Sequence, residues 1–360
     1  IVTVAATVSD LAGNIGNASE EVTVDTVAPT VTLVIDKSVL NISDNSSEIT
    51  LNFTETPRDA AGNPLDAAQV KALLTLPGTV SVSDLSSTDD GYTWTGTLTA
   101  TNDTEATIVN VSINTPYYDL AGNLGNTTNA SVTVDTKAPE ITQDAIGDGN
   151  LSFNEASSLV LSGTTIGVEE GREVILTITD INNALITRTA IVQSDGTYST
   201  TVDISAGLAE GQITVVAEVT DEAGNSASDN KEATLDLTAP TITITTVADD
   251  NVVDWSEKMV DGFTVTGTLT GAEEGRVITV TFDDADGNPI LDADGNPISA
   301  TGTVGTTDSW SVTVSADLAK LLKDGSTKAE VSDEAGNLAQ ATQSYELAAP
   351  PAPVITGYYD

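Results

Sequence analysis

Hydrophobic and polar residues alternate in short runs along the chain, which is the pattern of strands with one buried face. The clearest run is TITITT at 241–246, where isoleucine side chains would point to one face and threonine side chains to the other. The segment 139–239 holds seven such runs, separated by turns rich in Gly, Asn and Asp. They are 141–146, 159–163, 173–179, 186–192, 197–204, 213–220 and 232–235. This spacing predicts an antiparallel immunoglobulin-like sandwich.

Two sequence markers recur with a common period, which indicates a tandem array. Four copies of the motif D-x-A-G-N recur at intervals of 109, 102 and 112 residues, and a second string that ends in Ala-Pro follows the first three of these copies. The four copies start at Asp10, Asp119, Asp221 and Asp333, and the strings DTVAP, DTKAP and DLTAP start at Asp25, Asp135 and Asp236. The whole chain is therefore expected to be all-β, with tandem antiparallel immunoglobulin-like β-sandwiches forming an elongated rod.

The Ala-Pro steps predict the unit boundaries, because proline ends a strand ladder and stiffens a short connection. We expect the C-terminal part of a preceding unit at 1–27, full units at 28–138, 139–239 and 240–349, and the start of a following unit at 350–360. The array is thus expected to be longer than this chain. Helical turns are expected only at 66–74 and 316–323.

One aromatic residue recurs at a corresponding place in each full unit: Trp94, Tyr198 and Trp310. The simpler interpretation is a core side chain that packs against the opposite sheet. The alternative is an exposed platform on which a sugar could stack.

Composition narrows the function. Lys and Arg number 12 against 54 Asp and Glu, a formal net charge of −42, and the chain has neither His nor Cys. Such a charge repels nucleic acid and anionic membranes. The missing residues exclude thiolate nucleophiles, histidine bases and the usual zinc sites. Disorder is disfavoured because 39% of residues are hydrophobic, with Val and Ile prominent among them.

Acidic residues gather where the topology would bring loops together. In such a sandwich the incoming linker, the loop between the second and third strands (BC) and the loop between the sixth and seventh strands (FG) lie at one end. Every full unit has acids in all three places. They are Asp25, Glu55, Asp59 and Asp119; Asp135, Glu169, Glu170 and Asp221; and Asp236, Glu273, Glu274 and Asp333. Several carboxylates without basic partners favour bound Ca²⁺, although solvated turn residues are the alternative.

A second acidic set lies in the loop between the first and second strands (AB), at the exit end of a unit. Asp148 and Glu155 have the same seven-residue interval as Asp250 and Glu257, and Asp249 adjoins the latter pair. These loops predict further Ca²⁺ sites. In unit 28–138 Asp44 and Glu48 have another interval, which makes a site there doubtful. The doubled DADGNPI at 284–290 and 292–298 predicts a hairpin insertion rather than an EF-hand, because the twelfth loop position is Thr303 rather than Glu.

These motifs together resemble a known family. The VDTxAP linkers, D-x-A-G-N loops, D-x₆-E AB loops and T-G-x-E-x-G turns are similar to tandem bacterial Ig-like repeats of giant calcium-dependent surface adhesins of the repeats-in-toxin, type I secreted kind. The unit at 28–138 departs from the pattern and resembles a related subtype. The resemblance implies a Ca²⁺-rigidified extender on the bacterial cell surface, which projects a distal binding domain for adhesion and biofilm formation.

The expected partners follow from this interpretation. They are neighbouring units of the same chain in a monomeric rod, with no nucleic acid, no membrane insertion, and a glycan or surface ligand bound through another region. The alternative is a glycan- or protein-binding module, with unit 28–138 the best candidate because it carries Arg58, Trp94, Tyr117 and Tyr118. An enzyme is disfavoured, because the acids recur in every unit whereas a catalytic pair is expected once.

Overall fold

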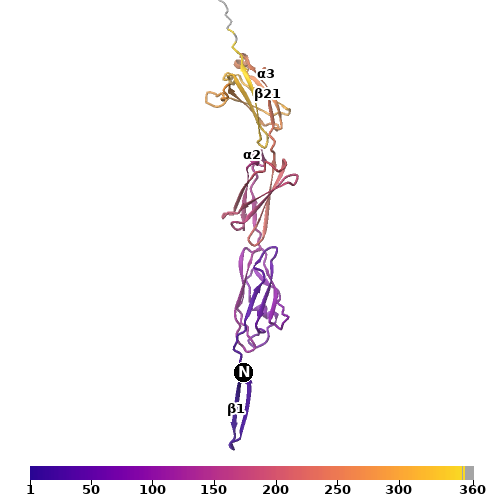
Figure 1. Cartoon of the computed structure of the whole chain (residues 1–360), viewed down its shortest axis with the longest axis vertical. Helices are drawn as coiled ribbons and strands as arrows, with labels where there is room; N and C mark the ends of the chain where they lie inside the picture. Colours follow the sequence, from indigo (N-terminus) through magenta and orange to yellow (C-terminus); the bar gives the residue numbers. More distant parts are fainter. Residues whose placement is uncertain (351, 353–360) are drawn as a thin grey trace, which may run out of the picture.

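The computed structural model describes residues 1–350 and 352, and its units follow one another end to end along one axis (Figure 1). The start of a further unit expected at 350–360 lies outside the described residues, apart from Pro350 and Ala352. The leading segment 1–27 is a hairpin of β1 (Val2–Ser9) and β2 (Ile15–Val22), whose valine side chains are exposed. None of the helices among the described residues is long and apolar enough to cross a membrane.

Unit 28–138 is a sandwich of two four-stranded sheets, in the orders β3-β5-β8-β7 and β4-β10-β9-β6. Its elements are β3 (Val31–Ile35), β4 (Val39–Leu40), β5 (Ser46–Phe53), α1 (Ala67–Ala72), β6 (Leu74–Thr75), β7 (Val80–Val82), β8 (Thr93–Ala100), β9 (Thr107–Ile113) and β10 (Thr128–Val134). The helix α1 lies inside the expected span 66–74, where Asp66 and Gln69 form a capping box.

Unit 139–239 has a three-stranded sheet, β11-β13-β16, and a five-stranded sheet, β12-β18-β17-β14-β15. Its elements are β11 (Glu140–Gln143), β12 (Asn150–Leu151), α2 (Phe153–Ala156), β13 (Leu159–Ile166), β14 (Glu173–Thr179), β15 (Leu185–Ile191), β16 (Thr197–Val202), β17 (Gly211–Thr220) and β18 (Ser226–Leu235). All seven expected runs overlap strands. The eighth strand, β12, was not predicted, because two residues paired in parallel with β18 leave no alternation to recognise.

Unit 240–349 repeats this arrangement with sheets β19-β21-β24 and β20-β26-β25-β22-β23. Its elements are β19 (Thr241–Val247), α3 (Ala248–Asn251), β20 (Val252–Val253), η1 (Glu257–Asp261), β21 (Phe263–Thr270), β22 (Val277–Asp284), β23 (Ser299–Thr303), β24 (Ser309–Val314), α4 (Ala316–Ala319), β25 (Gly325–Ser332) and β26 (Leu338–Leu347). Between β22 and β23, isolated bridges Asp283–Pro289 and Leu291–Pro297 extend the hairpin through the doubled DADGNPI segment.

The expectation that helical turns occur only at 66–74 and 316–323 is wrong. The elements α2, α3 and η1 lie in the AB loops, in which the sequence pattern indicated acidic ligands. The helix α2 forms because the Ser152 side chain accepts from the Glu155 N–H while the Glu155 side chain accepts from the Ser152 N–H. The same Glu155 that predicts a metal ligand therefore caps a helix.

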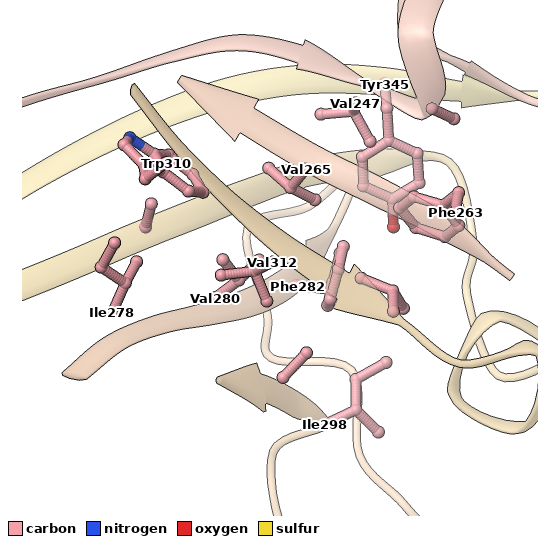
Figure 2. Packing of buried hydrophobic residues seen from close by; sticks show 14 of the residues in the cluster. Val247, Phe263, Val265, Ile278, Val280, Phe282, Ile298, Trp310, Val312 and Tyr345 are labelled. Carbon is pink, nitrogen blue, oxygen red and sulfur yellow. The ribbon is translucent and has the colours of Figure 1, made fainter. Parts of the chain in front are cut away.

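Each full unit has its own hydrophobic core, and the recurring aromatic residue belongs to it. Trp94, Tyr198 and Trp310 are only 7%, 1% and 4% exposed, so the core interpretation is confirmed and the sugar platform is wrong. In Figure 2 Trp310 lies at one end of the cluster in unit 240–349, and Phe263 and Tyr345 lie at the other.

The aromatic residue packs across a glycine in two of the units. Tyr198 pairs with Gly163, and Trp310 pairs with Gly267 on the neighbouring strand. The Tyr198 hydroxyl donates to the Thr142 carbonyl at 3.2 Å, and the Trp310 indole N–H donates to the Thr243 carbonyl at 3.1 Å. Burial raises the pKa of Tyr198 to about 12, with smaller contributions from nearby aspartates. A Cβ atom at Gly163 or Gly267 would lie within about 2 Å of the carbonyl oxygen that accepts this hydrogen bond, so only glycine fits at either position.

Candidate metal sites at the junctions between units

The D-x-A-G-N motif folds as one five-residue turn wherever it occurs. In the copy at Asp119 the Asn123 N–H donates to Asp119 Oδ1 at 2.8 Å, the Gly122 N–H donates to the Asp119 carbonyl, and Gly122 has a φ of +86° that favours glycine. Turns that start at Asp59, Asp284 and Asp292 have the same hydrogen bonds, although they do not lie in FG loops. The turn is therefore a general hairpin device, and its position decides whether it forms part of a site.

These hydrogen bonds also set the charge state of the turn aspartates. At Asp59 the Asn63 side chain is the main cause that lowers the carboxyl pKa. At Asp119 burial raises the pKa, but the hydrogen bonds from Asn123 outweigh it, so the pKa lies below its ordinary value. Both side chains are therefore held ionised and acceptor-only.

The linker that enters each full unit lies beside that unit's FG loop, as the topology predicts. The FG-loop asparagine makes the contact through its side-chain amide. Asn123 donates to the Asp25 carbonyl at 3.2 Å, Asn225 to the Asp135 carbonyl at 3.1 Å, and Asn337 to the Asp236 carbonyl at 2.9 Å. We refer to these places as the first, second and third junctions.

Three carboxylates converge at the first junction. Oxygen atoms of Asp25, Glu55 and Asp119 all lie within 4.8 Å of one another, and Asp119 is only 1% exposed. Among residues 1–350 and 352 this is the one acidic group that meets this distance, and none of its members forms an ion pair there. Asp59, predicted for the same site, belongs to the neighbouring turn and is outside the group.

The second and third junctions hold their acids differently. The Glu169 carboxylate accepts from the Glu222 N–H at 2.8 Å, and the Glu273 carboxylate accepts from the Glu334 N–H at 2.7 Å, so each links the BC loop to the FG loop. Asp221 and Asp333 are 1% and 0% exposed within their turns. Glu170 and Glu274 are exposed.

The second junction encloses a small acidic cavity of about 170 Å³. Its lining comes from both units: Val39, Ala106, Thr133, Asp135, Glu169, Glu222 and Ala223. Burial raises the pKa of Asp135, and the charges of Asp221, Glu105 and Glu169 raise it further. The protein groups around Asp135 therefore do not offset the cost of burying its negative charge.

In the AB loops the predicted ligands already hold the local backbone. Asp148 accepts from the Asn150 N–H, and Asp250 accepts from the Val252 N–H. Glu257 accepts from the Asp254 N–H at 2.8 Å. Burial raises the pKa of Glu257, and the charges of Asp254, Asp250 and Asp249 add to this. In unit 28–138 the Lys37 ammonium forms an ion pair with Asp44, so this aspartate already has a positively charged partner from the protein.

Two residues of the alternative binding module are unavailable to a ligand. Trp94 and Tyr117 are core residues, and Tyr117 packs edge-on against Phe53 with ring centroids 5.2 Å apart. Arg58 donates to the Gly62 carbonyl at 2.8 Å. The position of Trp94 in its strand already predicted a core residue, whereas Tyr117 lies between β9 and β10, where no strand alternation indicates burial.

The sequence also did not show what the FG-loop asparagines do. Asn225 and Asn337 each donate through the side-chain amide and accept through the side-chain oxygen in hydrogen bonds across the junctions. No local signal separates them from Asn63, which ends the same motif in the BC loop of unit 28–138 but, among the described residues, bonds only to Asp59 of its own turn.

Comparison with family models finds one match, which covers part of the chain. Residues 25–136 match the model of the bacterial Ig-like domain. A comparison with curated proteins finds no match.

Several solved structures resemble the chain. A Ca²⁺-stabilized adhesin that helps an Antarctic bacterium reach out and bind ice is 24% identical, with 96% of this chain and 81% of that one covered and a TM-score of 0.37. A tetra-tandem repeat from the extending region of a large adhesion protein is 25% identical, with coverages of 97% and 81% and a TM-score of 0.32. A bacterial immunoglobulin-like domain from the M. primoryensis ice-binding adhesin is 26% identical, with coverages of 31% and 99% and a TM-score of 0.24.

Proposed function

We propose that the chain, of which residues 25–136 match the model of the bacterial Ig-like domain, is a non-catalytic extender segment of a bacterial surface adhesin. In this proposal units 28–138, 139–239 and 240–349 are successive spacers, and 1–27 is the end of a preceding one. Their partners are the neighbouring units, and a distal region of the protein meets the surface ligand outside the cell. The end-to-end arrangement supports this, because such a chain gains length with each unit (Figure 1).

Calcium at the junctions would hold the units in line. The observation that carries this proposal is the convergence of Asp25, Glu55 and Asp119 within 4.8 Å. Negative charges on three carboxylates repel one another at this distance, and a divalent cation relieves the repulsion. Ca²⁺ takes six to eight oxygen ligands and tolerates irregular loops, and an affinity of about 10⁻⁴–10⁻³ M would suit an extracellular module.

The same ion would bind at the other junctions with a larger share of backbone and water ligands. We assign the second junction to Asp135, Glu169, Glu170 and Asp221, and the third to Asp236, Glu273, Glu274 and Asp333. The raised pKa of Asp135 beside an acidic cavity supports the second assignment. The AB loops would hold further ions through Asp148 and Glu155, and through Asp249, Asp250 and Glu257.

A structural role also accounts for the distribution of the acids. They recur at the linker, BC and FG positions of successive units, whereas a catalytic pair would be confined to one unit. The net charge of −42 keeps such rods apart in solution at low calcium and is partly neutralised when calcium binds.

Small-angle scattering of the full chain tests the proposal. At millimolar Ca²⁺ we expect a longer maximum dimension and a narrower range of shapes than in chelator, because the junctions stop bending. Mg²⁺ serves as the control ion, since it prefers a strict octahedral shell and retains its waters. An identical scattering profile with Ca²⁺ and with chelator would contradict calcium rigidification.

A further inference from the structure

The side chain of Asn225 is the most heavily used polar group at the second junction. Its backbone and side-chain N–H groups hold the Asp221 carboxylate at 2.8 and 2.9 Å, within the turn. Its amide also donates to the Asp135 carbonyl at 3.1 Å, and its Oδ1 accepts from the Ile42 N–H at 2.8 Å. Ile42 lies in the AB loop of the preceding unit. One asparagine, 3% exposed, therefore joins a loop of one unit, the linker and a loop of the unit before.

The third junction repeats the arrangement with different surroundings. Asn337 accepts from the Phe153 N–H at 2.9 Å and donates to the Asp236 carbonyl at 2.9 Å, and it is 5% exposed. Phe153 and Ile42 hold the same place, two residues beyond the short parallel strands β12 and β4. The donor in both cases is the backbone N–H, so an aliphatic residue and an aromatic residue can both occupy this position.

The chemistry of the contact favours asparagine over its relatives. The side chain must donate and accept at once, and an amide does both while a carboxylate only accepts. Aspartate at this place would also face Asp221 and a linker carbonyl. Alanine would leave the linker carbonyl and the AB-loop N–H without these partners in a site that excludes water, which is costly.

We propose that the last residue of the FG-loop D-x-A-G-N motif is an interunit latch, which orients each unit on its predecessor through hydrogen bonds that need no metal. Its receptor is the backbone N–H two residues beyond the short parallel strand of the preceding unit. The proposal does not rest on calcium, because every contact in it is between protein groups.

The latch also identifies a partner surface at the far end of the chain. Unit 240–349 carries Trp255 at the receptor position, two residues beyond β20, and Trp255 is 43% exposed. This exit end therefore fits another Ig-like unit with a D-x-A-G-N loop. In the other two units the N–H of a linker aspartate, Asp135 or Asp236, donates to the last carbonyl of the short parallel strand. In unit 240–349 the N–H of Ala348 makes this bond to Val253, so this linker has no carboxylate at that position. A hydrogen-bonded latch can act there where a linker acid cannot.

The test measures how widely two adjacent units move in chelator. Because the chain has no cysteine, the pair Ser81→Cys and Ser199→Cys gives unique spin labels at exposed positions on units 28–138 and 139–239. We expect Asn225→Ala to broaden the distance distribution at least twofold. The matched control is Asn63→Ala, which removes side-chain bonds to its turn aspartate in the BC loop at the first junction, at the other end of unit 28–138 from the second junction, and should leave the width unchanged.

Two further arms keep the result interpretable. Thermal unfolding shows whether the alanine variant stays folded. In a second comparison, Asn225→Asp and Asn63→Asp each remove the side-chain donor but keep the acceptor. Equal widths for the Asn225 and Asn63 variants would overturn the latch. If calcium does not change the distance distribution of the parent chain, that result contradicts only the proposed calcium role. The latch is tested separately, because its distances are measured in chelator.

Discussion

The fifth strand of each full unit pairs differently in the two kinds of unit. In unit 28–138 β7 pairs with β8, whereas in unit 139–239 β15 pairs with β14 and in unit 240–349 β23 pairs with β22. The chain segment that leads into this strand determines which strand it pairs with. A tight Asp-containing turn follows β14 and β22 and folds the next strand back beside them. In unit 28–138 a two-residue strand is followed by Pro77 and Gly78, and the chain crosses to the other sheet.

The junctions differ along the same division. At the first junction Glu55 stands with Asp25 and Asp119 in a compact acidic group. At the second and third junctions the corresponding glutamates bind backbone N–H groups, and a buried asparagine links the units. Related sequence motifs therefore support two ways of joining units: one concentrates negative charge, and the other uses directed hydrogen bonds.

The largest expected effect is a loss of stability on replacing a core glycine, and it should be larger in unit 240–349 than in unit 28–138. In Gly267→Ala the new Cβ would lie 1.8 Å from the Thr243 carbonyl and 2.6 Å from the Trp310 indole nitrogen, so unit 240–349 should lose about 3 kcal/mol of stability. In Gly96→Ala the nearest atom is Leu85 Cδ2 at 2.7 Å, the movable end of a side chain, and we expect about 1 kcal/mol. Calorimetry of the full chain would resolve the affected transition. Equal losses would mean that the aromatic crossing does not distinguish the units.

A second prediction concerns calcium at the compact group. Glu55→Gln removes one of three converging charges and should weaken one calcium-binding step roughly tenfold, because affinity follows the charge of the ligand set. The control is Glu218→Gln, which removes an exposed charge in β17 that belongs to none of the proposed sites, and it should leave calcium binding unchanged. Isothermal titration of both variants measures this. If the two lose affinity equally, the compact group is no special site.

The smallest effect tests a carboxylate that stabilises one unit away from the junctions. Asp180 is buried and accepts from the N–H groups of Ala209, Asn182 and Ala184, and the Ala209 bond is the main cause that lowers its pKa. Its folded pKa lies below the unfolded value, so the stabilisation is present above the unfolded pKa and is lost as pH falls through the folded one. We expect Asp180→Asn to lower the melting temperature of unit 139–239 at pH 7, and the difference from the parent to shrink in acid. A pH-independent difference would contradict this.

Much of the architecture follows from the sequence because its causes are local. Alternation of Val, Ile and Thr marks the strands, and D-x-x-G-N marks tight turns wherever it occurs, since glycine accepts the positive φ and the aspartate binds the following N–H groups. The period of these turns indicates the tandem units, and the place of Trp94, Tyr198 and Trp310 in their strands correctly predicts a core.

Only the tertiary structure decided which of several similar groups meet. Asn63 and Asn225 end the same motif, yet only Asn225 meets a second unit, because the position of the FG loop depends on strand pairing far along the chain. In the same way Glu55 joins two other acids, while Glu169 is taken by a backbone N–H. A residue's type and its immediate neighbours specify what it can bind. The packing of distant segments specifies what is there to be bound.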